Sequence, residues 1–342
     1  MKANWRRIIL GITLFGMLGA FFASSAFAVQ IKRVQRGIAN FDNDDVAVSV
    51  QLAYPVNQSS SIVLLHNTND PTANNREQNM FFTSQFESND AIVVERGGAN
   101  SPGSVFYQVV EFADGVSVQR GISSMNSATK IKNITLPVNL TDNAARAVPI
   151  VYTKAAFTTV TQTHELFLLP SFTDNATLRL DRLDATGTKV TQLVWQVAEF
   201  LTDATVETNT TTLPINGPND QNVTVTLNTP AVNPLLFTYF TGAVDMNGID
   251  PELFTTGELT NSTTAKFTRW YAPNTVNTST DVRFFAVNLT DPVSYVQNGS
   301  HIWNATPSGR LTFTSTNAAP IVVTTSASHG YATGDLVNIA GE

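Results

Sequence analysis

The stretch VFYQVVEFADGVSVQRG, residues 105–121, occurs again in altered form 88 residues further along the chain. The second copy reads LVWQVAEFLTDATVETN (193–209), and a fainter third copy reads VRFFAVNLTDPVSYVQNG (282–299). Upstream, the pentapeptide VQRGI occurs at both 34–38 and 118–122. Several blocks that recur in the same order at nearly one period indicate tandem structural repeats.

A second recurring block lies ahead of each copy and ends on an arginine. It reads FESNDAIVVER at 86–96, FTDNATLRLDR at 172–182 and LTNSTTAKFTR at 259–269. The arginine is in phase with the apolar positions of its strand, which is typical of a rim residue with a buried stem or of half of an ion pair. Ligand binding is the alternative, and we expect the structural role. The repeat-defining residues are Arg96, Arg182, Arg269, Tyr107, Trp195 and Phe285.

Within each repeat the apolar residues alternate with a period of two, as in VAVSVQL (46–52) and NVTVTL (222–227). Turn-rich stretches separate these runs, and no sustained 3.6-residue period follows the N-terminal segment. The pattern predicts an all-β protein with three tandem, immunoglobulin-size antiparallel β-sandwich repeats of about 88 residues. The predicted boundaries are 29–115, 116–204 and 205–300 for the sandwiches, and 301–342 for a partial small β-barrel.

The junction between two repeats is short. In this interpretation YQVVEF is the last core strand of one repeat, ADG (113–115) is the joint, and VSVQRG begins the next repeat. A joint of two or three residues leaves little room for independent motion, so we expect a stiff or gently bending rod. The segment VQIKRVQRG (29–37) is a candidate to add as a strand to the open sheet edge of a neighbouring molecule.

The N-terminus has the pattern of a secretory signal. Lys2, Arg6 and Arg7 form a basic region, an apolar run follows, and AFA (26–28) offers small residues at a cleavage site. We therefore predict cleavage after Ala28 and a secreted or cell-surface location. An uncleaved membrane anchor is the alternative, but the apolar run is short for a span of roughly 20 residues.

The charge balance narrows the classes of partner. The chain has 27 acidic and 20 basic residues and no cysteine. Three basic residues lie in the predicted signal, so the mature chain has 17 basic residues and a net charge near −10. Nucleic acid is therefore not an expected partner, because such binding needs a basic face. Without disulfides, stability must come from packing, assembly or bound ions.

One acidic loop is a candidate for a hard cation. NFDNDD carries Asp42, Asp44 and Asp45, whose oxygen atoms could bind Ca²⁺, while a solvated turn is the alternative. The loop does not repeat, and no other cofactor is expected. The four histidines lack metal-ligand spacing, and no hydrolase elbow, P-loop or dinucleotide motif occurs. We therefore expect no enzymatic activity and rank an exported hydrolase last among the classes.

Two resemblances follow from these residues. The segment SASHGYATGDLVNIAG (326–341) resembles the small β-barrel repeat of phage tail and bacterial surface proteins that is named after a half-domain of ubiquitin-activating enzymes. Residues 34–299 resemble the tandem WQVVEF repeats of uncharacterised bacterial surface and phage-associated proteins, to which no activity is attached. The resemblances imply an extracellular β-protein and name no ligand.

The leading hypothesis is a secreted, non-enzymatic structural protein, a rod or filament subunit of a cell-surface appendage or extracellular matrix. Its expected partners are copies of itself or other surface proteins, with no membrane contact after signal cleavage. The alternative is an adhesin or carbohydrate-binding module that uses the variable loops 97–104, 183–192 and 271–281. Trp270 and Tyr271 at the third loop could stack on a sugar or pack at a domain joint.

Overall fold

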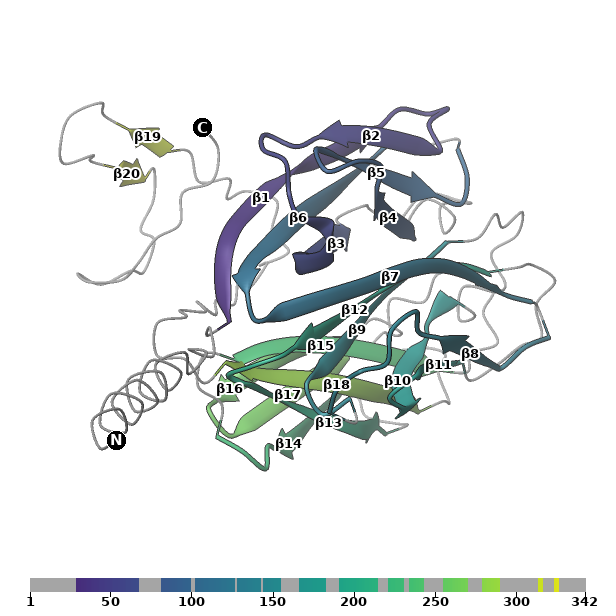
Figure 1. Cartoon of the computed structure of the whole chain (residues 1–342), viewed down its shortest axis with the longest axis vertical. Helices are drawn as coiled ribbons and strands as arrows, with labels where there is room; N and C mark the ends of the chain where they lie inside the picture. Colours follow the sequence, from purple (N-terminus) through teal and green to yellow (C-terminus); the bar gives the residue numbers. More distant parts are fainter. Residues whose placement is uncertain are drawn as a thin grey trace, which may run out of the picture. The chain divides into compact units, whose positions relative to one another are not determined.

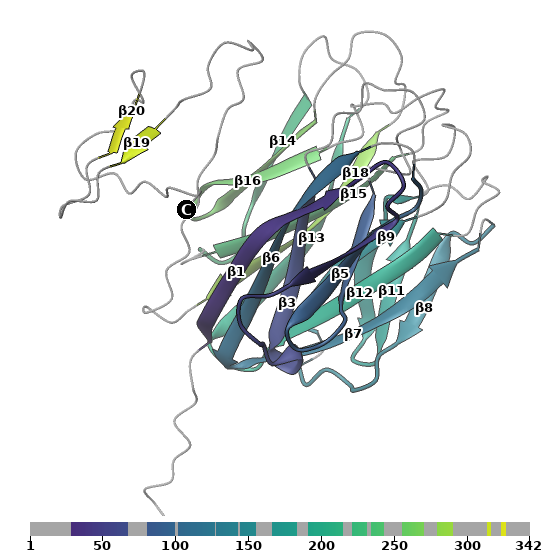
Figure 2. The same ribbon diagram turned by 90° about the horizontal axis from the view of Figure 1, so that it is seen from above.

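The computed structural model of the chain is built from β-strands (Figures 1 and 2). In the described residues every regular element is a strand except one short 3-10 turn, η1 (Gln58–Ser60), which confirms the predicted all-β class. These strands form six three-stranded antiparallel sheets and one two-stranded sheet. The structure describes residues 29–67, 81–99, 102–126, 128–142, 144–154, 166–182, 191–214, 221–230, 234–242, 255–269 and 279–289, and the backbone of 313–315 and 323–325.

The chain divides into two units, residues 1–297 and residues 298–342. In the second unit, β19 (Phe313–Ser315) and β20 (Val323–Thr325) form a two-stranded antiparallel ladder. The rest of the predicted barrel lies outside the described residues, so the barrel stays a prediction. Strands β1–β18 all belong to the first unit. Within the described part of the chain, no helix has both the length and the apolar character needed to cross a membrane.

The three repeats share one strand order. The first, sixth and third strands of each repeat form one sheet, called here the inner sheet, and the second, fifth and fourth form the outer sheet. Repeat 1 contains β1 (Gln30–Phe41), β2 (Ala47–Gln51), β3 (Ser61–Asn67), β4 (Phe82–Phe86), β5 (Ala91–Arg96) and β6 (Gly103–Asp114). Repeat 2 contains β7 (Val116–Met125), β8 (Ile131–Thr135), β9 (Ala147–Lys154), β10 (Leu169–Asp174), β11 (Thr177–Asp181) and β12 (Thr191–Phe200). Repeat 3 contains β13 (Ala204–Leu213), β14 (Gln221–Thr226), β15 (Pro234–Gly242), β16 (Thr255–Asn261), β17 (Thr264–Arg269) and β18 (Thr280–Leu289).

Each repeat buries a core between its inner and outer sheets. In repeat 1, Tyr107 and Val109 of β6 point toward the outer sheet, where they join Ile92 and Val94 of β5. The alternation of side chains along a strand produces this arrangement, because every second residue points to the same face. The corresponding cores of the other repeats contain Leu178, Leu180, Leu193, Trp195 and Val197, and Ala265, Phe267, Val282, Phe284 and Ala286.

The register of the sixth strands shows which residue of repeat 3 corresponds to Tyr107 and Trp195. Positions along the sixth strand can be counted from the residue that pairs with the first residue of the third strand. On this count Phe284 is equivalent to Tyr107 and Trp195. Phe284 lies in the core of its own repeat, as Tyr107 and Trp195 do, whereas Phe285 faces the opposite side of the sheet. Phe284 therefore occupies the position of Tyr107 and Trp195, and Phe285, one residue further on, faces the other side of the sheet, because side chains alternate along a strand.

The three inner sheets also pack against one another. Their shared central core draws on all three repeats and contains Val29, Ile62, Val110, Phe112, Val116, Val118, Val148, Ile150, Ala198, Phe200, Ala204, Phe285, Val287 and Leu289. The predicted stiff or gently bending rod of successive sandwiches is therefore wrong for this unit. The inner sheets pack together because the sixth strand of each repeat is apolar on both faces. The face turned away from the repeat's own core must therefore also be covered.

The two joints between repeats are held together. Gly115, with φ of +76°, turns the chain from β6 into β7, and a Cβ atom there would crowd Val29 at 3.2 Å. At the second joint Asp203 also has a positive φ, of 49°. The Leu201 N–H donates to Gly115 O at 2.8 Å, so the two turns are linked. Short joints thus direct the repeats onto one another.

The predicted donor segment 29–37 is already paired. Residues 30–41 form β1, which runs antiparallel to β6 of the same chain from Gln30 to Phe41. Its backbone groups toward β6 are therefore used within the molecule. Strand β1 is outermost in its sheet, so its other edge has no partner strand among the described residues, and addition to a neighbour's sheet stays a prediction.

Candidate assembly surface

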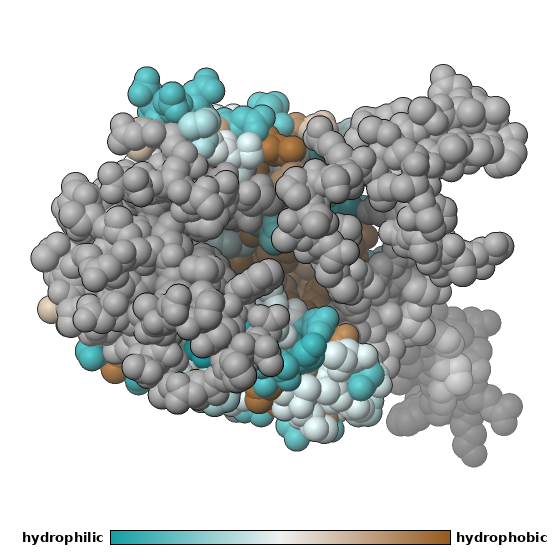
Figure 3. Space-filling model, turned by 180° about the vertical axis from the view of Figure 1, so that it is seen from behind, coloured by the Kyte–Doolittle hydropathy of each residue, from teal (hydrophilic) through white to brown (hydrophobic). Residues whose placement is uncertain are grey.

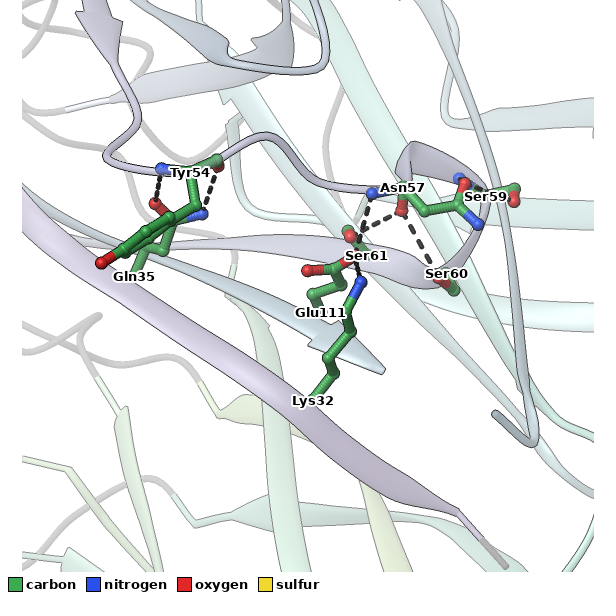
Figure 4. Close-up of polar contacts among 8 residues, drawn as sticks. All are labelled: Lys32, Gln35, Tyr54, Asn57, Ser59, Ser60, Ser61 and Glu111. Atoms are coloured by element: carbon green, nitrogen blue, oxygen red, sulfur yellow. Dashed lines mark hydrogen bonds and ion pairs between the residues drawn. The ribbon is translucent and has the colours of Figure 1, made fainter. Parts of the chain in front are cut away.

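The glutamine of the VQRG motif anchors a loop of its own repeat. Gln35 Nε2 donates to Tyr54 O at 2.8 Å, and Gln35 Oε1 accepts from the Tyr54 N–H at 2.9 Å (Figure 4). Gln119 makes the same two bonds to Val138, at 2.7 and 2.9 Å. The shared motif therefore reflects a shared structural contact in the first two repeats.

The glutamate of the repeat has a similar role. Glu111 Oε1 accepts from Lys32 Nζ at 2.8 Å and from the Asn57 N–H at 3.1 Å (Figure 4). Burial raises the pKa of Glu111, but the hydrogen bonds from Lys32 and Asn57 and the positive charges of Lys32 and Arg33 outweigh it and lower the pKa below its ordinary value. A buried carboxylate in such contacts stays ionised and holds the loop before β3.

The closing arginines bind the loops between first and second strands. Arg96 Nε donates to Asp45 O and its second terminal nitrogen to Asp42 O, both at 2.7 Å. Arg182 donates in the same way to Thr129 O and Asn126 O. Arg269 donates to Pro214 O at 2.9 Å. These contacts place Arg96, Arg182 and Arg269 in one structural position, as the sequence indicates.

The same contacts bear on the candidate calcium loop. Two carbonyl oxygens of this loop accept from Arg96, and Asp45 Oδ2 accepts from the Asp42 N–H at 2.7 Å. Asp42, Asp44 and Asp45 are all described, and the described residues contain no group of three acidic or histidine side chains placed to hold a metal ion. The structure does not bring these carboxylates together, and calcium binding there stays a prediction.

The inner sheet of repeat 2 covers the open edge of repeat 1. Strand β3 is outermost in its sheet, so one of its edges lacks a partner strand. Gln196 of β12 binds that edge, accepting from the Val63 N–H at 3.0 Å and donating to Val63 O at 2.9 Å. Tyr152 of β9 accepts from the Leu65 N–H at 2.8 Å, and burial raises the pKa of Tyr152 to about 12. Side chains thus replace the missing strand.

Arg120 extends the same contact toward the outer sheet. Its guanidinium donates to Gln58 O at 2.6 Å and to Ser61 O at 2.7 Å, and it lies 4.8 Å from the ring centre of Phe86. Burial lowers the pKa of Arg120 to about 10, so the side chain still carries its charge at pH 7. Hydrogen bonds to carbonyls and a cation–π contact therefore hold repeat 2 on the edge of repeat 1.

Repeat 3 contacts repeat 2 in the same manner. The Tyr239 hydroxyl, equivalent to that of Tyr152, donates to Pro149 O at 2.6 Å in β9. Arg283 donates to Pro170 O at 3.4 Å in β10. Burial, with the nearby Tyr152, raises the pKa of Tyr239 despite a hydrogen bond from the backbone of β9. In both internal contacts the inner sheet of the later repeat lies on the third and fourth strands of the earlier one.

In repeat 1 the corresponding surface is open. We call it the β1–β6 face, and it consists of Ile31, Val34, Arg36, Ile38, Phe106 and Gln108. Val34 is 36% exposed and Phe106 is 42% exposed, whereas their equivalents Val118 and Val194 in repeat 2 are 7% and 4% exposed. The positions of Val34 and Phe106 are therefore covered in repeat 2 and exposed in repeat 1, whereas Ile38 and its equivalent Ile122 are exposed in both repeats.

Repeat 3 has the complementary open surface. We call it the β15–β16 edge, formed by the outermost strands of its inner and outer sheets. Gly257 and Glu258 are exposed there, whereas Ser84 and Pro170, which occupy the position of Gly257 in the earlier repeats, are buried. Glu258 forms an exposed ion pair with Lys266 at 3.3 Å. Repeat 2 covers β4 and repeat 3 covers β10, but no described element covers the β15–β16 edge in the same way.

A cavity of about 620 Å³ lies between the third strands of the three inner sheets. Its walls are mainly apolar, and Figure 3 shows apolar surface at the floor of a hollow. Tyr152 and Tyr239 line it, but their hydroxyls already bind the neighbouring repeat. The cavity is therefore suited to apolar contacts more than to hydrogen-bonded recognition.

Several predicted recognition residues cannot be placed. Trp270 and Tyr271, residues 183–190 and most of the third variable loop lie outside the described residues.

The contacts between repeats were not predicted from the sequence, although two recurring residues pointed to them. The glutamine of YQVVEF recurs in WQVAEF, and a tyrosine recurs at the same position of β9 and β15.

Comparison of the chain with protein-family models, with curated proteins and with solved structures finds no significant match. The two resemblances drawn from the sequence, to tandem WQVVEF repeats and to a small β-barrel repeat, therefore stay predictions.

Proposed function

We propose that this chain is a secreted, non-enzymatic structural protein that self-associates as a subunit of an extracellular filament or cell-surface appendage. The observation that carries the proposal is the open β1–β6 face, where Val34, Phe106 and Gln108 are exposed although their equivalents Val118, Val194 and Gln196 in repeat 2 are buried. Apolar residues grouped on one sheet face are a feature of protein–protein contact surfaces. The export pattern at residues 1–28 supports an extracellular location.

The polar residues that recur in the repeats support a structural role. Gln35, Glu111 and Arg96 all bind backbone groups of their own repeat, and Gln196 binds the backbone of another. Residues used in this way stabilise loops and edges, and their recurrence needs no reaction to explain it. We further infer that each repeat is an immunoglobulin-size β-sandwich and that residues 301–342 begin a small β-barrel.

The test is assembly of the mature protein. Residues 29–342 would be purified and studied by sedimentation velocity over a wide concentration range and by negative-stain electron microscopy. Association that rises with concentration, with regular fibres or oligomers, is the expected result. A monomer at the highest soluble concentration would overturn the proposal.

An adhesin or carbohydrate-binding module is the second candidate, favoured by the cavity of about 620 Å³ and its aromatic lining. The lining includes Phe81, Phe82, Phe237 and Phe240. A glycan panel probed with the same protein tests this candidate, and saturable binding by a monomeric protein would favour it over self-association.

A further inference from the structure

We propose that the β1–β6 face of one molecule binds the β15–β16 edge of a second copy, so that the chains join head to tail. The inference rests on the proposed function, because it names the surfaces through which self-association occurs. The occupant of each surface is therefore another copy of this chain.

The two internal contacts are the template. Repeat 2 places its inner sheet on β3 and β4 of repeat 1, and repeat 3 places its inner sheet on β9 and β10 of repeat 2. Within the described residues, three repeats joined by two such contacts leave the β1–β6 face of repeat 1 and the β15–β16 edge of repeat 3 without this contact. The molecule thus displays both halves of a contact that it already forms twice.

The residues that make the template contact are present on the open face. Arg36 and Gln108 lie opposite each other on β1 and β6, just as Arg120 and Gln196 do on β7 and β12. Arg120 and Gln196 bind repeat 1, whereas Arg36 and Gln108 are exposed. Repeat 1 therefore carries the same two polar side chains at the same positions, without the edge that they bind in repeat 2.

The edge of repeat 3 supplies the matching groups. Arg120 lies 4.8 Å from the ring centre of Phe86 and lines one small pocket with Gln85 of β4, and the residues at the positions of Gln85 and Phe86 in β16 are Glu258 and Leu259. A contact formed on the template would therefore place Arg36 next to Glu258, and opposite charges at such positions favour the correct partner. Gln108 would meet the backbone of Leu236, which is equivalent to Val63.

The geometry of the contact determines the kind of assembly. The two surfaces differ, so the contact is heterologous, and each added molecule presents a new face and a new edge. Such a series continues as a filament unless its rotation closes a ring. A face-to-face dimer would leave both β15–β16 edges open.

The charge pair gives a sharp test in the complete mature chain. R36E and E258R would each place like charges at the contact, and each variant alone should raise the concentration for half-maximal association by about tenfold or more. An equal mixture of the two should associate again, because every face then meets an edge of opposite charge. D142R is the matched control, since Asp142 is also an exposed carboxylate in a surface ion pair, with Arg146 at 3.4 Å, and it should associate as wild type does.

The outcomes separate the two proposals. Wild-type association that R36E and E258R leave unchanged would overturn this interface and leave the proposed function standing, whereas a monomeric wild type would overturn both. If the effect of R36E and E258R does not depend on protein concentration and mixing the two variants does not rescue it, repeats 1 and 3 of one chain close on each other. Loss of the effect on deletion of residues 298–342 would show that the second unit occupies the face, and either result would overturn the head-to-tail contact.

Discussion

Gln196 in repeat 2 forms two hydrogen bonds with the backbone of Val63 in repeat 1, and Gln196 is only 2% exposed. Replacing Gln196 by alanine would leave a buried N–H and a buried carbonyl without partners. Each such group costs about 1–3 kcal/mol, so Q196A should lower the free energy of unfolding measurably in a urea titration. Q108A, at the equivalent exposed position, is the matched control and should change the monomer by less than about 0.5 kcal/mol. Equal effects of the two variants would contradict the contact between repeats.

Gly121 lies directly opposite Trp195 in the neighbouring strand. A Cβ atom at position 121 would lie 2.6 Å from the Trp195 ring, so G121A must displace the indole or the strand. We expect a loss of about 1–3 kcal/mol in the free energy of unfolding, the usual cost of overfilling a packed site. The control is N209A, because Asn209 occupies the same place opposite Phe284 and is exposed. Thermal unfolding followed by circular dichroism would compare the two, and an unchanged G121A would contradict the close ring contact.

The lowered pKa of Glu111 predicts an acid-sensitive part of the stability. Because the folded-state pKa lies below the unfolded value, the ionised carboxylate stabilises the fold above the unfolded pKa, and this contribution is lost as the pH falls through the folded pKa. Urea unfolding between about pH 6 and pH 3 should therefore show a steeper loss for wild type than for E111Q. K32A keeps the carboxylate but removes its partner, so the folded-state pKa should move toward the unfolded value and the loss on acidification should be smaller than in wild type. Parallel profiles for wild type and E111Q would contradict this role.

The shared core predicts that damage in one repeat spreads to the others. Phe200 is 2% exposed, and its ring centre lies 6.1 Å from that of Phe112 in repeat 1. F200A should cost about 3–5 kcal/mol and reduce hydrogen-exchange protection in the inner sheets of all three repeats. F267A, in the separate core of repeat 3, should reduce protection mainly in that repeat. Loss confined to repeat 2 in F200A would indicate independently stable repeats.

Local patterns in the sequence were enough to predict the strands. Period-two alternation, turn residues and the recurrence of YQVVEF indicated strands, tandem repeats and short joints, because these depend on neighbours a few residues apart. The register of the third copy is known only from the structure. Phe284 and Phe285 are both aromatic, so the letters alone could not show which of them faces the core of its own repeat.

The sequence by itself determined the all-β class and the recurrence of its blocks at nearly one period, whereas the strand order within each repeat is known only from the structure. Only the tertiary structure decided that the inner sheets pack together instead of lying in a row. Apolar residues on both faces of a strand require cover, but they do not say which distant strand provides it. Gln196 illustrates the same limit, because its partner Val63 lies 133 residues away and is defined only when two repeats meet.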